Sequence, residues 1–159
     1  NSDVHFYSPQ KMLEVITVGS TDHLDQHSTF SNYGLELDVV APGGDSGTPC
    51  TDFSFQNILS LRAANTDGYS QCGEEWNDKM VVGNDYYRSR GTSMAAPHAA
   101  GAVALILANR PDLTNTDVNY VLKASADDLS YPGFDVKNGF GRINLEKALT
   151  VDSVPEFTV

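Results

Sequence analysis

Runs of apolar, β-branched residues that alternate with Gly, Pro and polar segments predict a chain of alternating strands and helices. Residues 14–19 (EVITVG) are apolar without alternation, which is typical of a strand buried on both faces. A second short strand is expected at residues 37–41, where Pro42 and two glycines end it. Two further strand-like segments lie at residues 58–62 and 86–90.

The second half of the chain carries the helical patterns. Residues 94–109 are almost wholly small and apolar, and a helix that is apolar all round is expected to be buried. Because proline is tolerated only in the first turn, Pro97 places the start of this helix near residues 92–93. An amphipathic helix is predicted from Thr114, and a last short helix runs from a cap at Asn144 through residue 149.

The chain of 159 residues fits one domain, which we expect to span residues 1–150 and to be followed by a tail at 151–159. Residues 45–84 are rich in polar residues and glycine, and we interpret most of them as a long ordered loop inserted into this domain. Hydrophobic residues make up 40% of the chain, so it has the material for a folded core.

The overall charge argues against nucleic-acid and membrane partners. The chain has 10 Lys and Arg against 21 Asp and Glu, a formal net charge of −11. Binding to a phosphate backbone or to anionic lipid rewards basic patches. No apolar stretch approaches the roughly 20 residues that a membrane helix needs.

Two cysteines, Cys50 and Cys72, lie in the polar segment. Two cysteines in a polar loop of an acidic chain fit an extracellular disulfide better than free cytosolic thiols. The sequence therefore predicts a secreted protein with a Cys50–Cys72 disulfide.

Three readings place a nucleophilic serine. GDSGTP at residues 44–49 is similar to the serine motif of chymotrypsin-like proteases, but only 45 residues precede Ser46 and helices follow it. Those proteases place their serine near the end of a double β-barrel, after the His and Asp, so a turn is the better interpretation.

GTSMA at residues 91–95 is close to the α/β-hydrolase elbow, which needs a histidine later in the chain. Only His98 follows, in the same helix, so this reading fails on order.

The third reading takes Ser93 in its helical setting. A serine in the first turn of a helix lies where free backbone N–H groups converge and where the helix dipole favours negative charge. A tetrahedral oxyanion needs this environment. The alternative is that Ser93 only caps the helix.

A longer string around Ser93 resembles the serine motif of the subtilisin-like proteases, the subtilases. The resemblance covers roughly residues 7–149. The segments that carry it are GTSMAAPH (91–98), VITVG (15–19), FSNYG (30–34), LDVVAPG (37–43) and GFGRIN (139–144).

This resemblance implies a three-layer α/β fold with a mostly parallel sheet, of which the chain is the C-terminal part. It implies that Ser93 is the nucleophile of a serine endopeptidase that cleaves polypeptides through an acyl-enzyme. Gly91, Thr92 and His98 would be structural residues of the motif, and Asn1 would donate to the oxyanion. No cofactor is implied for catalysis.

The chain departs from the family pattern because the upstream Asp and His motifs are absent. His5, His23 and His27 lack the glycine-rich histidine setting of the family, so we expect them at the surface. The triad His and Asp would then come from upstream sequence of the same catalytic domain, and this chain alone would be inactive. The alternative is an inactive subtilase-like module that binds a partner.

The resemblance also implies structural calcium. Asp38 and the main-chain oxygens of residues 11–14 lie in a segment that resembles one of the family's calcium sites. A carboxylate at a strand end with no metal is the alternative, since calcium takes six to eight oxygen ligands.

We predict that Cys50 and Cys72 are disulfide-bonded in the native protein. They are separated by 22 positions, and a closed loop of that length stabilises the fold by about 3 kcal/mol in the chain-entropy account. Titration of the native, non-reduced protein with a thiol reagent should detect no free thiol, and the reduced protein should unfold at lower temperature. Two reactive thiols in the non-reduced protein would contradict the pairing.

Overall fold

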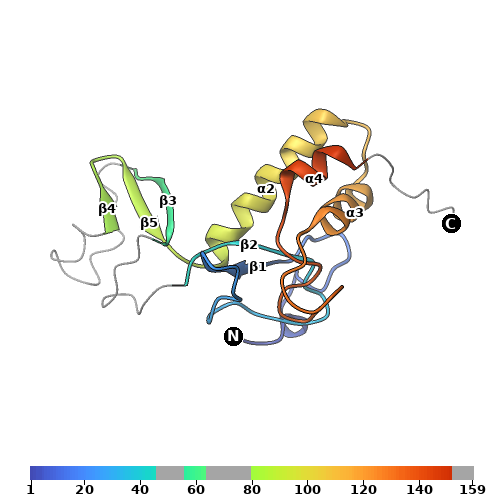
Figure 1. Cartoon of the computed structure of the whole chain (residues 1–159), viewed down its shortest axis with the longest axis horizontal. Coiled ribbons are helices and arrows are strands. Elements are labelled where there is room, and N and C mark those ends of the chain that lie inside the picture. Colours follow the sequence, from blue (N-terminus) through green and yellow to red (C-terminus); the bar gives the residue numbers. More distant parts are fainter. Residues whose placement is uncertain (46–55, 64–79, 152–159) are drawn as a thin grey trace, which may run out of the picture.

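The computed structural model describes residues 1–45, 56–63 and 80–151 (Figure 1). In chain order, its elements are η1 (Val4–Phe6), β1 (Val18–Thr21), β2 (Val39–Pro42), β3 (Ile58–Leu61), β4 (Val81–Val82), β5 (Tyr86–Ser89), α2 (Thr92–Asn109), α3 (Asn115–Ser125) and α4 (Leu145–Thr150). No helix among the described residues has the length and apolarity needed to cross a membrane.

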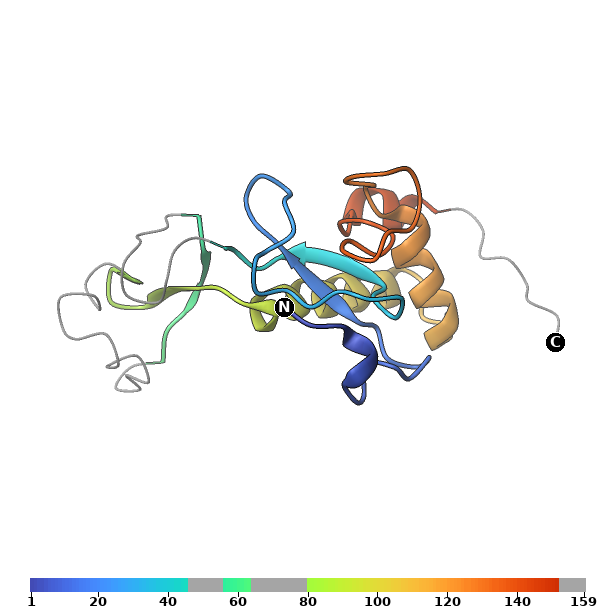
Figure 2. The ribbon, with the colours of Figure 1, turned by 90° about the horizontal axis from the view of Figure 1, so that it is seen from below.

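A parallel strand pair forms the centre of the fold. β1 pairs with β2 so that Val18 lies opposite Val39 and Thr21 opposite Pro42. The middle of β2 is fully buried, as expected for a parallel strand covered on both sides. Helix α2 packs against both strands, and α3 and α4 pack against α2 and each other (Figure 2). The core cluster comprises Val39, Ala102, Ile106, Val118, Val121, Leu122 and Ala148. The predicted α/β class is confirmed.

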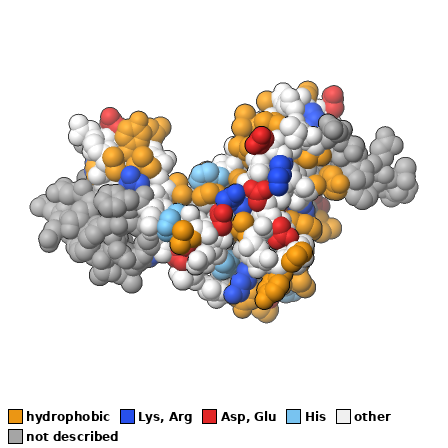
Figure 3. All heavy atoms as spheres, viewed as in Figure 1, with side chains coloured by type: hydrophobic (Ala, Val, Ile, Leu, Met, Phe, Trp, Pro, Cys, Tyr) orange, Lys and Arg blue, Asp and Glu red, His pale blue; other side chains and the backbone are white. Residues whose placement is uncertain are grey.

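A second, antiparallel sheet lies beside the start of α2 (Figure 1). Its strand order is β3-β5-β4, with Ile58 opposite Ser89 and Val81 opposite Tyr87. The sequence predicted β3 and β5. It did not predict β4, which lies within the segment interpreted as a loop, because two adjacent valines give no periodic pattern. Figure 3 shows hydrophobic side chains at the surface over this sheet, where Leu61 is 78% exposed.

The first predicted strand begins four residues later than expected. Residues 14–17 are outside β1, and the strand starts at Val18. The backbone N–H of Thr17 donates to Asp38 Oδ2 at 2.6 Å, so a side chain takes the place of a ladder partner there. Pro42 closes β2 as its last residue, where a missing N–H is tolerated.

The apolar helix forms where predicted, but it is not buried all round in this structure. Helix α2 buries Ala95, Ala99, Ala102 and Ile106, which recur at helical spacing on one face. On another face Leu105 is 50% exposed. The described residues therefore cover only one side of a helix whose composition is apolar on every side.

The later helices begin at the predicted caps. Thr114 and Asp117 form a capping box at the start of α3, and this contact lowers the pKa of Asp117. Asn144 Oδ1 accepts from the Lys147 N–H at 3.0 Å at the start of α4. Side-chain acceptors thus satisfy backbone donors at both helix starts.

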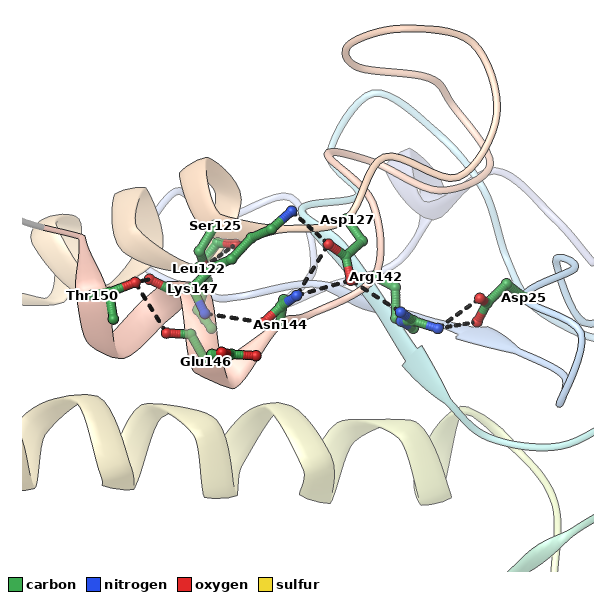
Figure 4. Close-up of polar contacts among 9 residues, drawn as sticks. All are labelled: Asp25, Leu122, Ser125, Asp127, Arg142, Asn144, Glu146, Lys147 and Thr150. Carbon is green, nitrogen blue, oxygen red and sulfur yellow. Dashed lines mark hydrogen bonds and ion pairs between the residues drawn. The ribbon is translucent and has the colours of Figure 1, made fainter.

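An ionic cluster fixes the C-terminal part of the chain (Figure 4). Asp127 accepts from Arg142 at 3.0 Å, from Lys147 at 2.7 Å and from Asn144 at 3.0 Å. Arg142 also contacts both carboxylate oxygens of Asp25 at 2.6 Å. These bonds connect the 22–26 turn, the end of α3 and the start of α4. The hydrogen bonds from Lys147, then Asn144 and Arg142, lower the pKa of Asp127 to about 2.

We predict that Asp127→Asn lowers the free energy of unfolding by about 1–2 kcal/mol at pH 7, since the substitution removes a charged acceptor from two cations. The folded-state pKa lies below the ordinary value, so the stabilisation is complete above about pH 4 and fades as the pH falls toward 2. Denaturant unfolding between pH 2 and 7 measures the effect. Asp112→Asn, at an exposed position, is the control and should change little. An equal deficit for Asp127→Asn at pH 2 and pH 7 would contradict the assignment.

Candidate active site

Ser93 is the second residue of α2, inside its first turn. Gly91 occupies the N-cap position, and its carbonyl oxygen accepts from the N–H groups of Met94 at 2.9 Å and Ala95 at 3.3 Å. Ser93 is therefore not the helix cap, and its side chain is exposed. The position combines a hydroxyl with the positive end of an 18-residue helix dipole.

The chain enters α2 through a conformation that suits glycine. Gly91 has a φ of 141°, a value that side chains rarely permit. Its N–H donates to the carbonyl oxygen of Gly43 at 2.8 Å. Gly43 directly follows β2, so the end of the central strand pair is bonded to the residue two before Ser93.

Two cavities adjoin Ser93. One, of about 350 Å³, is lined by Val4, Pro9, Gln10, Val15, Ile16, Thr17, Val18, Phe30, Asn32, Leu37, Thr92, Ser93 and Ala96. The other, of about 320 Å³, is lined by Ile58, Leu59, Ser60, Ser93, Met94, Pro97 and His98. Ser93 lines both, so groups bound in either cavity would lie beside the same hydroxyl. The sequence predicted β3 as a strand, but it gave no indication that β3 lies beside Ser93, because this depends on tertiary contacts.

The histidines have contacts other than Ser93. His98 Nδ1 bonds to the carbonyl oxygen of Met94 at 2.8 Å, one turn back along α2. His5 Nδ1 lies 2.6 Å from Glu36 Oε1, and this hydrogen bond lowers the pKa of Glu36. His5 and His23 are exposed as expected, whereas His27 is half-buried with Nε2 3.2 Å from the carbonyl oxygen of Ser31.

Asn1, the expected oxyanion donor, directs its side-chain amide elsewhere. Its Nδ2 donates to the carbonyl oxygen of Thr29 at 3.1 Å. Asn1 does not line either cavity beside Ser93. The role expected for Asn1 stays a prediction.

Asp38, the expected calcium ligand, is occupied by protein groups. One carboxylate oxygen accepts from the Thr17 N–H, and the other is 2.5 Å from Lys123 Nζ. An ammonium group at this distance repels a cation, so the residues around Asp38 do not fit calcium. Within residues 1–45, 56–63 and 80–151, no three His, Cys, Asp or Glu side chains gather as metal ligands. Calcium at another position stays a prediction.

The proposed disulfide partners, Cys50 and Cys72, lie outside the described residues. Ser46, interpreted from sequence as part of a turn, also lies outside them.

Comparison with known proteins finds one family over most of the chain. The profile of the subtilase family, Peptidase_S8, matches residues 1–141. The cell wall-associated protease of Bacillus subtilis is 33% identical over 89% of this chain, which spans 15% of that protein. Subtilisin of Bacillus pumilus is 34% identical over 88% of this chain, which spans 38% of it.

Solved structures agree with the sequence comparison. A protease from Pseudoalteromonas arctica has a TM-score of 0.72 and 29% identity, over 94% of this chain and 39% of its own. Fervidolysin from Fervidobacterium pennivorans, a keratinolytic enzyme related to subtilisin, has a TM-score of 0.70 and 29% identity, over 89% of this chain and 20% of its own. The chain thus spans well under half the length of these relatives.

We predict that Lys123→Met lowers the free energy of unfolding by about 2 kcal/mol, because it leaves the largely buried Asp38 carboxylate without its cation. Lys137→Met removes a charge at an exposed position and should have little effect. Thermal unfolding of both variants is measured with 5 mM EDTA and with 5 mM CaCl₂, roughly the concentration that fills a calcium site of the weaker extracellular kind. The comparison separates an Asp38–Lys123 ion pair from a calcium site at Asp38. Full rescue of Lys123→Met by calcium would contradict the ion-pair role.

Proposed function

The chain belongs to the subtilase family, and from this membership we propose that it is part of a secreted serine endopeptidase in which Ser93 is the nucleophile. The position of Ser93 carries the proposal. It is exposed in the first turn of a long apolar helix and lines two cavities. The family match covers residues 1–141, which include this motif. The substrates would be polypeptides.

The chemistry assigned to Ser93 is acyl transfer. Its Oγ attacks the carbonyl carbon of a peptide bond while a histidine base takes the hydroxyl proton. The carbonyl oxygen becomes an oxyanion, which N–H groups and the dipole at the start of α2 stabilise. Collapse of the tetrahedral intermediate breaks the C–N bond, and the histidine gives its proton to the leaving amine. Water then hydrolyses the acyl-enzyme by the reverse sequence of proton transfers. No cofactor is needed for these steps.

The base and its orienting aspartate would come from upstream sequence of the same catalytic domain. The histidines described here have other contacts or lie at the surface. Both relatives are more than twice as long as this chain, so they have room for these residues. Members of the triad act as a unit, and loss of one costs about 10⁴–10⁶ in rate.

The exposed side of α2 supports an upstream part of the same catalytic domain as the source of the base. Most residues of α2 that are exposed in this structure are small or apolar, namely Ala96, Pro97, Ala100, Gly101, Ala104, Leu105 and Ala108, and the exposed polar ones are Ser93, His98 and Asn109. Exposed apolar surface beside two cavities is a surface that another part of a fold would bury favourably. The remaining part of the catalytic domain is the occupant that we propose, because it would also bring the base to Ser93.

A secreted location fits both the cysteines and a named relative. The cell wall-associated protease of Bacillus subtilis is one-third identical to this chain. The acidic composition and the two cysteines in a polar segment are also typical of extracellular proteins.

We predict that a fluorophosphonate probe labels Ser93 in the complete catalytic domain and hardly labels the 159-residue chain. The start of α2 stabilises an oxyanion but removes no proton from the hydroxyl, so labelling needs the base. Mass spectrometry of both proteins and of their Ser93→Ala variants measures the modification, and a peptide substrate measures hydrolysis.

Three outcomes distinguish the alternatives. Labelling and hydrolysis confined to the complete domain support the proposal. Equal activity of the 159-residue chain, abolished by Ser93→Ala, would show that the base lies within it. An unreactive complete domain would contradict the protease proposal and favour an inactive module that binds a partner.

A further inference from the structure

Three serines that the proposed reaction does not use are completely buried between β1 and the following loop. Ser20, Ser28 and Ser31 each have 0% exposure. A buried hydroxyl is costly unless it is hydrogen-bonded, so each of these side chains must have a partner. Ser31 Oγ accepts from the Ser20 N–H at 3.0 Å and thereby holds the loop against β1.

The other two hydroxyls form a directed chain. Ser28 Oγ donates to the carbonyl oxygen of Gly44 at 2.9 Å. Ser20 Oγ lies 2.7 Å from Ser28 Oγ. A hydroxyl has one hydrogen, and Ser28 gives its hydrogen to Gly44, so Ser20 is the donor to Ser28. The order of donation is therefore Ser20 to Ser28 to Gly44.

The end of this chain of hydrogen bonds is the segment that contacts the start of α2. The N–H groups of Gly43 and Gly44 both donate to the carbonyl oxygen of Thr21, at 3.0 and 3.1 Å. The carbonyl oxygen of Gly43 in turn accepts from the Gly91 N–H at 2.8 Å. Gly43 and Gly44 are thus bonded to β1 on one side and to Gly91 on the other.

The packing around Gly43 is tight on both sides. A Cβ at this position would collide with Ser20 Oγ and would lie 2.6 Å from the Gly91 carbonyl oxygen. A displacement of the Gly43–Gly44 segment therefore moves Gly91 with it. Gly91 is the N-cap of α2, and its carbonyl oxygen holds the first turn that contains Ser93.

We propose that Ser20 and Ser28 are positioning residues for Ser93, acting through Gly43, Gly44 and Gly91. This inference rests on the proposed function of Ser93 as a nucleophile. The two hydroxyls touch neither substrate nor reacting atoms. They fix the position of the first turn of α2 and therefore of the Ser93 hydroxyl. A misplacement of a reacting group by about 1 Å costs on the order of 100-fold in rate.

The test uses the complete catalytic domain and measures kcat, KM and the rate of fluorophosphonate labelling of Ser93. Ser28→Ala breaks both hydrogen bonds, so we expect kcat and the labelling rate to fall by about tenfold or more with KM nearly unchanged. Ser20→Ala removes one donor and should have a smaller effect of the same kind. Because Ser20 acts through Ser28, the double variant should match Ser28→Ala alone.

Ser125→Ala is the matched control. Ser125 is also buried, at 2% exposure, and its Oγ donates to the carbonyl oxygen of Leu122 at 3.3 Å. It belongs to α3, which packs toward the other end of α2 (Figure 1). Ser125→Ala should lower the thermal unfolding temperature and leave kcat and the labelling rate unchanged.

The outcomes separate this inference from the protease proposal. If the wild-type domain is labelled and Ser28→Ala and Ser20→Ala keep its labelling rate and kcat, the serines are merely structural and the inference is wrong. If Ser28→Ala does not fold, a reduced kcat in folded Ser20→Ala supports the inference and an unchanged kcat overturns it. If the wild-type domain is itself unreactive, the protease proposal fails, and the positioning role fails with it.

Discussion

The hydrogen bond from the Gly91 N–H to the Gly43 carbonyl oxygen joins the two halves of this structure. On one side, it connects to the parallel pair of β1 and β2, where the buried valines lie. On the other side it fixes Gly91, the N-cap of α2. A helix is stiff, so its packing against the strands and its bonded N-cap together determine where each side chain of its first turn lies. The position of Ser93 therefore depends on how β2 ends.

Helix α2 shows how composition and burial can disagree within part of a fold. Its buried face consists of alanines and Ile106, and close packing against β1 and β2 needs such small side chains. The exposed residues are mostly small and apolar too, apart from Ser93, His98 and Asn109. A helix in permanent contact with water usually carries charged residues on one face. The composition of α2 is thus that of a helix covered on all sides, whereas the described residues pack against only one of its faces.

The sequence predicted most elements because their signals are local. The start of α2 agrees with the prediction, although Pro97 lies in the second turn and not in the first turn that the prediction assumed. The caps at Thr114 and Asn144 fixed the starts of α3 and α4. The start of β1 was wrong because the partner of the Thr17 N–H is a carboxylate 21 residues later, and no local pattern reveals such a contact. Ser93 could be proposed as the nucleophile because a short motif surrounds it. The place of β3 beside Ser93 and the contacts of the Ser20 and Ser28 hydroxyls depend on tertiary packing, so no local pattern predicts them.

The contacts beside Gly91 differ in chemistry from the ionic cluster around Asp127, and electrostatics gives a reason. The ion pairs of Arg142 and Lys147 with Asp127 connect the closing segment to α4. Near Gly91 the contacts use hydroxyls and backbone groups. A buried carboxylate there would oppose the negative charge that develops on an oxyanion. Neutral hydrogen bonds can fix a position without adding a net charge, which suits a site that relies on the dipole of its own helix.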